Sequence, residues 1–312
     1  MIPRLPFAAT ILAVALPLQA QPAPTSETRY QRFTRQSREA ETKGLAEAFR
    51  GVTARGAVEP GLFPVRSTGV STGPVREAAR AFLAALTPAQ RAKTVFPIED
   101  PEWRKWMNQH FYVRQGVSFQ EMDEAQRAAA FGLMRAGLSA KGLDLARDIM
   151  RLNHTLGELN NNNFEEYGEW LYWITVMGEP SADRPWGWQV DGHHLIINYF
   201  VLGDQVVMSP VFLGSEPVIA RSGKYKGISI LQDEQNRGLA LRRSLTEAQR
   251  KKAVLEVSKA ENNILAQAFK DNLVLDYAGV PGAELTPAQR DLVLGLIGLF
   301  VSNMADGHAT VK

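Results

Sequence analysis

The sequence of 312 residues contains no cysteine. This absence excludes disulfide bonds, iron–sulfur clusters, thiolate metal sites and a cysteine nucleophile. Histidine is also scarce, with five residues in the whole chain. Any metal ion must therefore be held by a few imidazoles, by carboxylates or by water.

Several nucleotide-binding and catalytic motifs are missing as well. The chain has no G-x-G-x-x-G loop, no Walker loop, no G-x-S-x-G elbow and no EF-hand. These absences argue against a nucleotide cofactor and against an α/β-hydrolase. The charge is nearly balanced, with 35 basic and 33 acidic residues, so nothing points to nucleic acid as a partner.

The N-terminus has the pattern of a secretory signal. Residues 1–20 combine the basic Arg4, an uncharged and mostly apolar run over 5–18, and Ala20 at a cleavage position. A buried first helix and a membrane anchor are the alternatives, but the apolar run is shorter than the roughly 20 residues of a span. We expect residues 21–312 to form a single α+β domain, secreted or periplasmic, with no membrane span after signal removal.

A short repeat marks the starts of helices. "LTPAQRAK" at 86–93, "LTEAQRKK" at 245–252 and "LTPAQRDL" at 285–292 share Leu-Thr-x-Ala-Gln-Arg, and "EMDEAQRAA" at 121–129 is a looser copy. Thr or Asp followed three residues later by Gln is a capping box. We therefore predict helices that begin near residues 87, 123, 246 and 286. The most apolar of them, "DLVLGLIGLFVSNM" at 291–304, is expected in the core.

The middle of the chain changes to strand patterns. Aromatic and β-branched runs occur at 170–178, 188–204 and 205–217, with a tight turn expected at Gly203 and Asp204. Odd and even positions of these runs are both apolar, although they face opposite sides of a strand, which indicates a sheet covered on both faces. The predicted fold class is α+β, mainly helical, with a central antiparallel sheet around residues 170–213.

The most conspicuous candidate site is the pair His193 and His194. On a regular strand, adjacent side chains point to opposite faces, so the two rings would bind one metal together only if a bulge at Gly192 turned one of them. Asp191 and His193 would share a face as an acid–base or ligand couple. The alternative is that both rings are ordinary core histidines.

Two glutamates follow strand runs. Glu216 lies in "FLGSEP" and Glu179 in "MGEPS". If both converge with the histidines at one end of the sheet, they provide a metal ligand or a general base. The alternative is that they are solvated turn residues.

A cluster of tryptophan and arginine is the other candidate. Trp103 and Arg104 lie in "PEWRKWMNQHFYVRQG", and Trp186 and Trp188 lie in "RPWGW". Tryptophan as a platform and arginine as a fork are typical of a cleft for an anion or a carbohydrate. Aromatic packing on the core is the alternative.

With these residues in view, the chain resembles a bacterial family of secreted proteins catalogued as domain of unknown function 3500. The blocks that carry the resemblance are "WRKWMN", "GLSAKGLDLARDIMRLN", "YWITVMGEPSADRPWGWQVDGHHLIINYF", "PVFLGSEP" and "KGISILQDEQNRGLAL". The resemblance implies an exported protein without an established activity. It also implies a further family segment beyond Lys312, with a His-x-His strand, so we expect this chain to lack the C-terminal part of the family pattern.

Two functions follow from these residues as expectations. The first is a periplasmic metal-dependent enzyme, hydrolytic or oxidative, in which His193 and His194 bind a transition metal ion and Glu216 or Glu179 acts as ligand or base. The second is a non-catalytic periplasmic protein that binds a small polar or sugar-like ligand at the tryptophans and Arg104. The sequence leaves the oligomeric state open.

Overall fold

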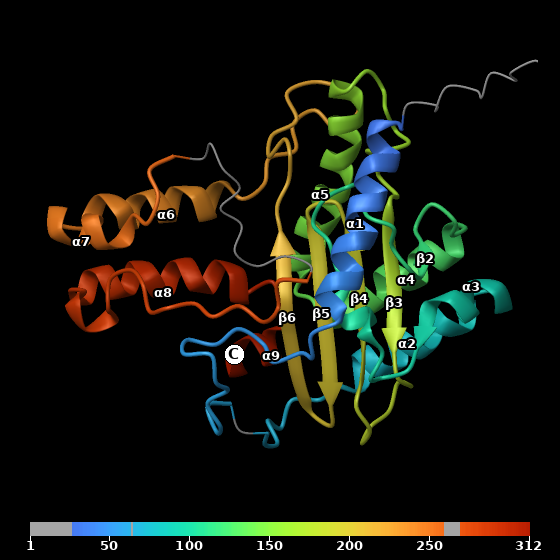
Figure 1. Cartoon of the computed structure of the whole chain (residues 1–312). Coiled ribbons are helices and arrows are strands. Elements are labelled where there is room, and N and C mark those ends of the chain that lie inside the picture. Colours follow the sequence, from blue (N-terminus) through green and yellow to red (C-terminus); the bar gives the residue numbers. More distant parts are fainter. Residues whose placement is uncertain (1–26, 64, 259–268) are drawn as a thin grey trace, which may run out of the picture.

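The computed structural model describes residues 27–63, 65–258 and 269–312 (Figure 1). The expected signal peptide, residues 1–20, lies outside these ranges. The helices of the described part are α1 (Arg29–Leu45), α2 (Gly73–Ala85), α3 (Pro88–Thr94), α4 (Glu124–Gly137), α5 (Ala140–Leu159), α6 (Gln232–Ser244), α7 (Glu247–Ala253), α8 (Pro287–Val301) and α9 (Asp306–Val311), with short 3-10 turns η1 (Pro101–Arg104) and η2 (Gly282–Glu284).

The strands form one sheet. They are β1 (Val95–Phe96), β2 (Val117–Ser118), β3 (Tyr172–Met177), β4 (Trp186–Gly192), β5 (Leu195–Leu202) and β6 (Gln205–Leu213). The order is β1-β3-β4-β5-β6, and β2 also pairs with β3. Strands β3 to β6 are antiparallel and occupy 172–213, which confirms the predicted fold class; β1 is parallel to β3, so the whole sheet is mixed.

The four predicted helix starts are confirmed. Helices α3, α4, α7 and α8 begin after Thr87, Asp123, Thr246 and Thr286, and each start has both bonds of a capping box. The predicted turn at Gly203 is also present, with Gly203 at φ +60 between β5 and β6.

The predicted strand over 188–204 is wrong, because the chain reverses within it. Strand β4 ends at Gly192 and β5 begins at Leu195, so His193 and His194 are the two residues of a tight turn. The hydrophobic pattern hides the turn because β4 and β5 are both buried and apolar on either side of it.

The sheet has one apolar and one polar buried face. Trp188 and Tyr199 stack with ring centroids 5.0 Å apart on the face that packs on the helices α2, α4 and α5. On the other face, buried Gln189 donates a hydrogen bond of 2.7 Å to Asn198. Both faces of β3 to β5 are therefore covered, as expected.

The prediction that 291–304 is a core helix is wrong. Within α8 the buried residue is Gln289, while Leu294, Ile297 and Phe300 are 64%, 50% and 49% exposed. Helices α6 and α8 lie side by side and project beyond the edge of the sheet formed by β6 (Figure 1). None of the described helices is both long and apolar enough to cross a membrane.

Two glycines of α4 give a matched stability test. A Cβ at Gly137 would lie 2.9 Å from ring carbons of both Trp188 and Tyr199, whereas a Cβ at Gly132 would meet open space. We expect Gly137→Ala to lower the free energy of unfolding by about 1–3 kcal/mol through overpacking. The change Gly132→Ala should raise it by up to about 1 kcal/mol, since alanine is the better helix former. Urea unfolding measures both, and equal effects of the two changes would contradict the packing described here.

Candidate functional site

The turn between β4 and β5 brings its two histidines together. The ring centroids of His193 and His194 lie 4.1 Å apart, so the expectation that they point to opposite faces is wrong. His194 has φ +60, a left-handed conformation that is uncommon for a residue other than glycine. Its N–H donates to the carbonyl of Asn108 at 2.9 Å, and its carbonyl accepts from Gly214 at 2.9 Å.

Gly192 has a steric role just before this turn. A Cβ there would lie 2.1 Å from the ring of Tyr172. The Tyr172 hydroxyl donates a hydrogen bond of 2.9 Å to the carbonyl of His193. The ring therefore crosses the glycine and fixes the main chain of the turn.

A buried ion pair lies on the polar face next to the turn. Arg114 Nε donates to Asp191 Oδ1 at 2.8 Å, and the two side chains are 1% and 7% exposed. The remaining four guanidinium N–H groups are directed at main-chain carbonyls of one loop, those of Met107, Gln109, His110 and Tyr112. Arg114 thus binds the whole loop to β4, and no donor of its guanidinium is left over for a ligand.

Asp191 carries the negative charge of this pair. Burial raises the pKa of Asp191 to about 6, while the charge and hydrogen bond of Arg114 oppose that rise. The N–H of Met107 also donates to the Asp191 carboxylate at 3.2 Å. The carboxylate is therefore ionised at neutral pH and fully bonded.

The tautomer of His193 follows from its neighbour Asn153. Asn153 Nδ2 donates to the carbonyl of Gly168 at 2.9 Å, so its Oδ1 is the atom that faces His193 Nδ1 at 2.8 Å. Nδ1 must then carry the proton, and Nε2 keeps its lone pair. Burial lowers the pKa of His193 to about 2, with smaller contributions from the charges of His194, His110 and Arg114. The ring is neutral at physiological pH.

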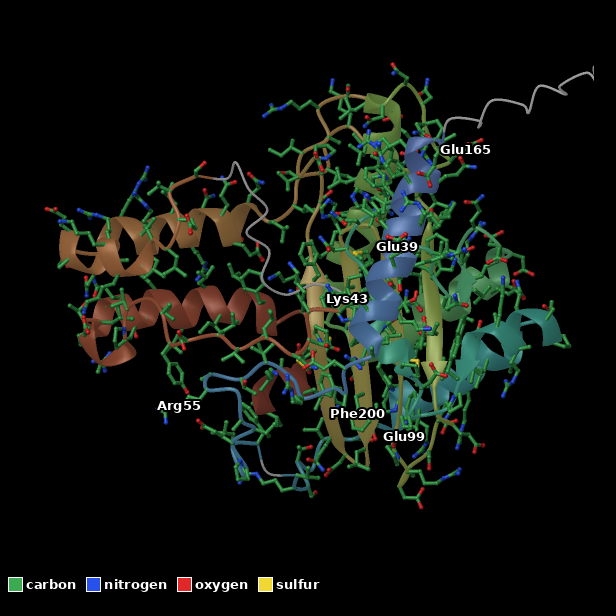
Figure 2. All side chains as sticks on the ribbon, in the orientation of Figure 1. Glu39, Lys43, Arg55, Glu99, Glu165 and Phe200 are labelled. Atoms are coloured by element: carbon green, nitrogen blue, oxygen red, sulfur yellow. The ribbon has the colours of Figure 1, made fainter. Side chains whose placement is uncertain are left out.

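His193 lines a cavity of about 230 Å³, which we call the histidine pocket. Its walls come from the loop fixed by Arg114, from α5, from β3 and from the loop before β3, and comprise His110, Tyr112, Val113, Arg114, Asn153, Glu165, Glu166, Leu171, Trp173 and His193. Figure 2 shows Glu165 at the end of the molecule opposite Phe200 of β5. The pocket therefore lies at the β4–β5 turn end of the sheet.

Acceptor groups dominate the pocket. Glu166 Oε2 lies 3.4 Å from His110 Nε2, and the Tyr167 hydroxyl lies 3.4 Å from the same nitrogen. Burial lowers the pKa of His110, against the opposing charge of Glu166. Two carboxylates, an imidazole lone pair and no free guanidinium together favour a ligand that donates hydrogen bonds and carries no negative charge.

His194 and Glu216 also lie at this end of the sheet. His194 Nε2 is 3.9 Å from Glu216 Oε2 and has no hydrogen-bond partner among the described residues. Glu179 lies at the opposite end, in the loop between β3 and β4, and pairs in solvent with Arg184 at 2.8 Å. Within the described residues, no group of three or more His, Asp or Glu side chains is arranged to hold a metal ion.

The predicted tryptophan–arginine cluster does not line the histidine pocket, since neither Arg104 nor Trp103, Trp186 or Trp188 is among its residues. Trp103 Nε1 donates to the carbonyl of Ile98 at 2.9 Å, and Arg104 forms a two-pronged ion pair with Asp271 at 2.6 and 3.1 Å. Trp186 and Trp188 are fully buried in the core. Of the pocket residues, His193 was itself a candidate in the sequence, and the segment 101–116 that contains Trp103 and Arg104 also supplies His110, Tyr112, Val113 and Arg114.

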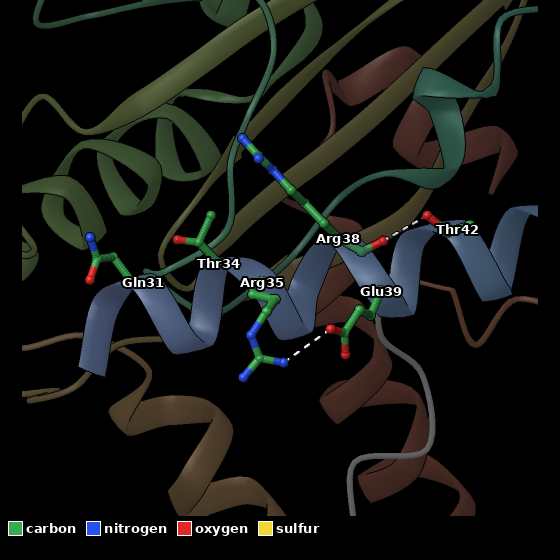
Figure 3. A pocket seen from close by; sticks show the side chains of 6 residues that line it. All are labelled: Gln31, Thr34, Arg35, Arg38, Glu39 and Thr42. Carbon is green, nitrogen blue, oxygen red and sulfur yellow. Dashed lines mark hydrogen bonds and ion pairs between the residues drawn. The ribbon is translucent and has the colours of Figure 1, made fainter. Parts of the chain in front are cut away.

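A second depression, about 440 Å³, is a weaker candidate. Its side chains all come from α1, as Figure 3 shows, and most of them are exposed. Arg35 and Glu39 pair with each other at 3.0 Å along the helix. One helix alone encloses no ligand, so the histidine pocket remains the better site.

The fold and the pocket together define an α+β protein with a buried polar site at one end of a mixed sheet. The chain belongs to the family described as protein of unknown function (DUF3500), whose model matches residues 68–312. This confirms the resemblance seen in the sequence. No match was found among curated proteins or among solved structures.

Two arginine–carboxylate pairs of equal length give a matched test of the ion pair that fixes the loop. Asp191→Ala leaves Arg114 buried without its counter-charge, so we expect a loss of about 3–5 kcal/mol in unfolding free energy. Glu179→Ala is the control, because it removes the partner of Arg184 in an exposed ion pair with the same N–O distance of 2.8 Å. It should leave the urea midpoint of unfolding unchanged. A small effect of Asp191→Ala would show that the loop is held by other contacts.

Proposed function

We propose that this chain is an exported protein that binds a small, uncharged, hydroxyl-bearing molecule in the histidine pocket. The observation that carries the proposal is the state of His193. Its ring is neutral, its Nδ1 proton is engaged by Asn153, and its Nε2 accepts no hydrogen bond from the part of the chain that the structure describes. Such a nitrogen is a ready acceptor for a ligand hydroxyl.

The rest of the pocket supports a sugar-like ligand. Glu165 and Glu166 add carboxylate acceptors, and Trp173 and Tyr112 add aromatic walls. Pockets for drug-sized ligands have volumes of about 300–1,000 Å³, so a cavity of about 230 Å³ suits a smaller molecule. Export rests on the signal pattern of residues 1–20.

Calorimetry with a panel of monosaccharides and small polyols tests this proposal. We expect at least one of them to bind, and His193→Gln and Glu166→Gln each to weaken that binding about tenfold, the effect of losing roughly 1.4 kcal/mol of hydrogen bonding. His154→Gln is the control, because His154 stacks on Phe164 and does not line the pocket. Failure of the whole panel, or unchanged affinity in both pocket variants, would refute the proposal.

A metal-dependent enzyme is the second candidate, and the pair His194 and Glu216 favours it. His194 Nε2 is buried and has no hydrogen-bond partner in the part of the chain that the structure describes, and Glu216 Oε2 lies 3.9 Å away. Burial lowers the pKa of His194, against the opposing charge of Glu216, so burial favours the neutral form of the ring, which is the form that binds a metal ion. Two protein ligands would leave positions for water, which a transition metal ion activates for hydrolysis.

Elemental analysis of the purified chain, after incubation with Zn²⁺ and desalting, tests the metal site. We expect one equivalent in the wild type and its loss in His194→Ala, with a smaller loss in His193→Ala. The matched control is His154→Ala, since His154 forms a comparable surface pair with Glu158 at 3.7 Å. An absence of retained metal in the wild type would eliminate this candidate.

A further inference from the structure

The chain contains two copies of one helical unit. The first comprises α2, α3 and α4, and the second comprises α6, α7 and α8. In each copy the capping glutamines of two helices bond to each other reciprocally: Gln90 with Gln126 at 3.2 and 2.8 Å, and Gln249 with Gln289 at 3.1 and 3.0 Å.

The flanking contacts repeat as well. Gln126 donates to the carbonyl of Ala85, the last residue of α2, and Gln289 donates to that of Ser244, the last residue of α6. In the first unit, Gln90 donates to the carbonyl of Glu121, whose side chain pairs with Lys93. In the second unit, Gln249 donates to the carbonyl of Glu284, whose side chain pairs with Lys252. The two units therefore match at the residues that join their helix starts.

This equivalence assigns a packing face to α8. Counted from the N-caps Asp123 and Thr286, the α4 residues Leu133 and Met134 correspond to Leu296 and Ile297. In α4 both are fully buried, in the core cluster that also contains residues of the sheet. In α8 neither is buried, and Ile297 is 50% exposed. The helix therefore carries apolar residues at the positions that α4 buries, but the described part of the chain leaves them uncovered.

The open edge of the sheet lies next to this face. Among the described strands, β6 pairs only with β5. A groove of about 350 Å³ beside it is lined by Val211 and Phe212 of β6, by Phe300 of α8, and by Met304 and Lys312 further along the chain. No charged residue occurs in β6 or over 292–301. Edge strands usually carry charges that prevent association, so their absence here marks a contact surface.

We propose that the arm formed by α6 and α8 docks on the β6 edge of a second copy of this chain. Because α8 corresponds to α4, which packs in the core with the sheet, we expect α8 to pack on a sheet as well. The uncharged edge strand β6 of the second copy provides that surface. In a dimer with two-fold symmetry, α8 of each copy covers the β6 edge of the other, so the same contact forms twice. Pro210 has no N–H and interrupts a continuous ladder at the edge, so side-chain packing forms the contact.

Sedimentation equilibrium of the full chain tests the dimer. We expect a wild-type dimer at micromolar concentration, and at least a hundredfold weaker association in Leu294→Glu/Ile297→Glu, whose positions are exposed and need no core rearrangement. The matched control Leu159→Glu changes a leucine of similar exposure, 59% against 64%, at the end of α5. A monomeric wild type, or equal association of the double variant and the control, overturns the proposal.

Disulfide crosslinking tests where the contact lies. Because the chain has no cysteine of its own, only the introduced cysteines can form disulfides. A mixture of Ile297→Cys and Val211→Cys copies should form a disulfide-linked heterodimer under mild oxidation, whereas Leu159→Cys with Val211→Cys should not. If instead Ile297→Cys copies crosslink efficiently to each other and the mixed pair does not form, α8 packs on α8 and the β6 edge is not the docking site.

Discussion

The buried ion pair between Arg114 and Asp191 is the constraint on which the candidate site depends. Asp191 is on β4, and Arg114 gathers the main-chain carbonyls of residues 107–112 around its guanidinium. The loop would otherwise leave these carbonyls unbonded under the protein surface, at a considerable free-energy penalty. Because the loop is fixed, Asn108 meets the histidine turn and His110 comes within 5.4 Å of the His193 ring, measured between centroids.

Arg114 of this ion pair also contributes to the neutral state of the imidazoles in the pocket. Arg114 lies near His193 and His110 and disfavours protonation of both, in addition to the larger effect of burial. Arg114 therefore influences the pocket through its positive charge, while its N–H groups bond to Asp191 and to main-chain carbonyls. The neutral form of His193 is due mainly to burial, and the positive charge of Arg114 is a smaller contribution in the same direction.

Local signals in the sequence predicted the helix starts and most of the sheet. Capping boxes are local, since Thr87 and Gln90 need only each other, and the pattern gives α3, α4, α7 and α8 correctly. The turn at His193 was missed because it contains neither glycine nor asparagine, and the strain of its left-handed residue is borne by contacts from Asn108 and Gly214. Strands of two residues such as β1 and β2 are too short to show any alternation.

The site was only partly predictable, for a related reason. His193 and His194 stand out by composition, but Asn153, Glu166 and Trp173 come from three separate segments that nothing in their local sequence connects. Apolar composition likewise placed α8 in the core, because a hydrophobic face looks the same whether it is buried within the chain or at its surface.

The reciprocal glutamine bonds have a consequence for how the molecule folds. Gln90 caps its own helix and simultaneously bonds to Gln126, which caps another helix 36 residues further along the chain. Each capping box forms within its own helix start, and the reciprocal bonds between Gln90 and Gln126 add to both only when α3 and α4 lie together. In each helical unit a pair of side-chain amides joins two helix starts, so contact between the two helices stabilises the first turns of both.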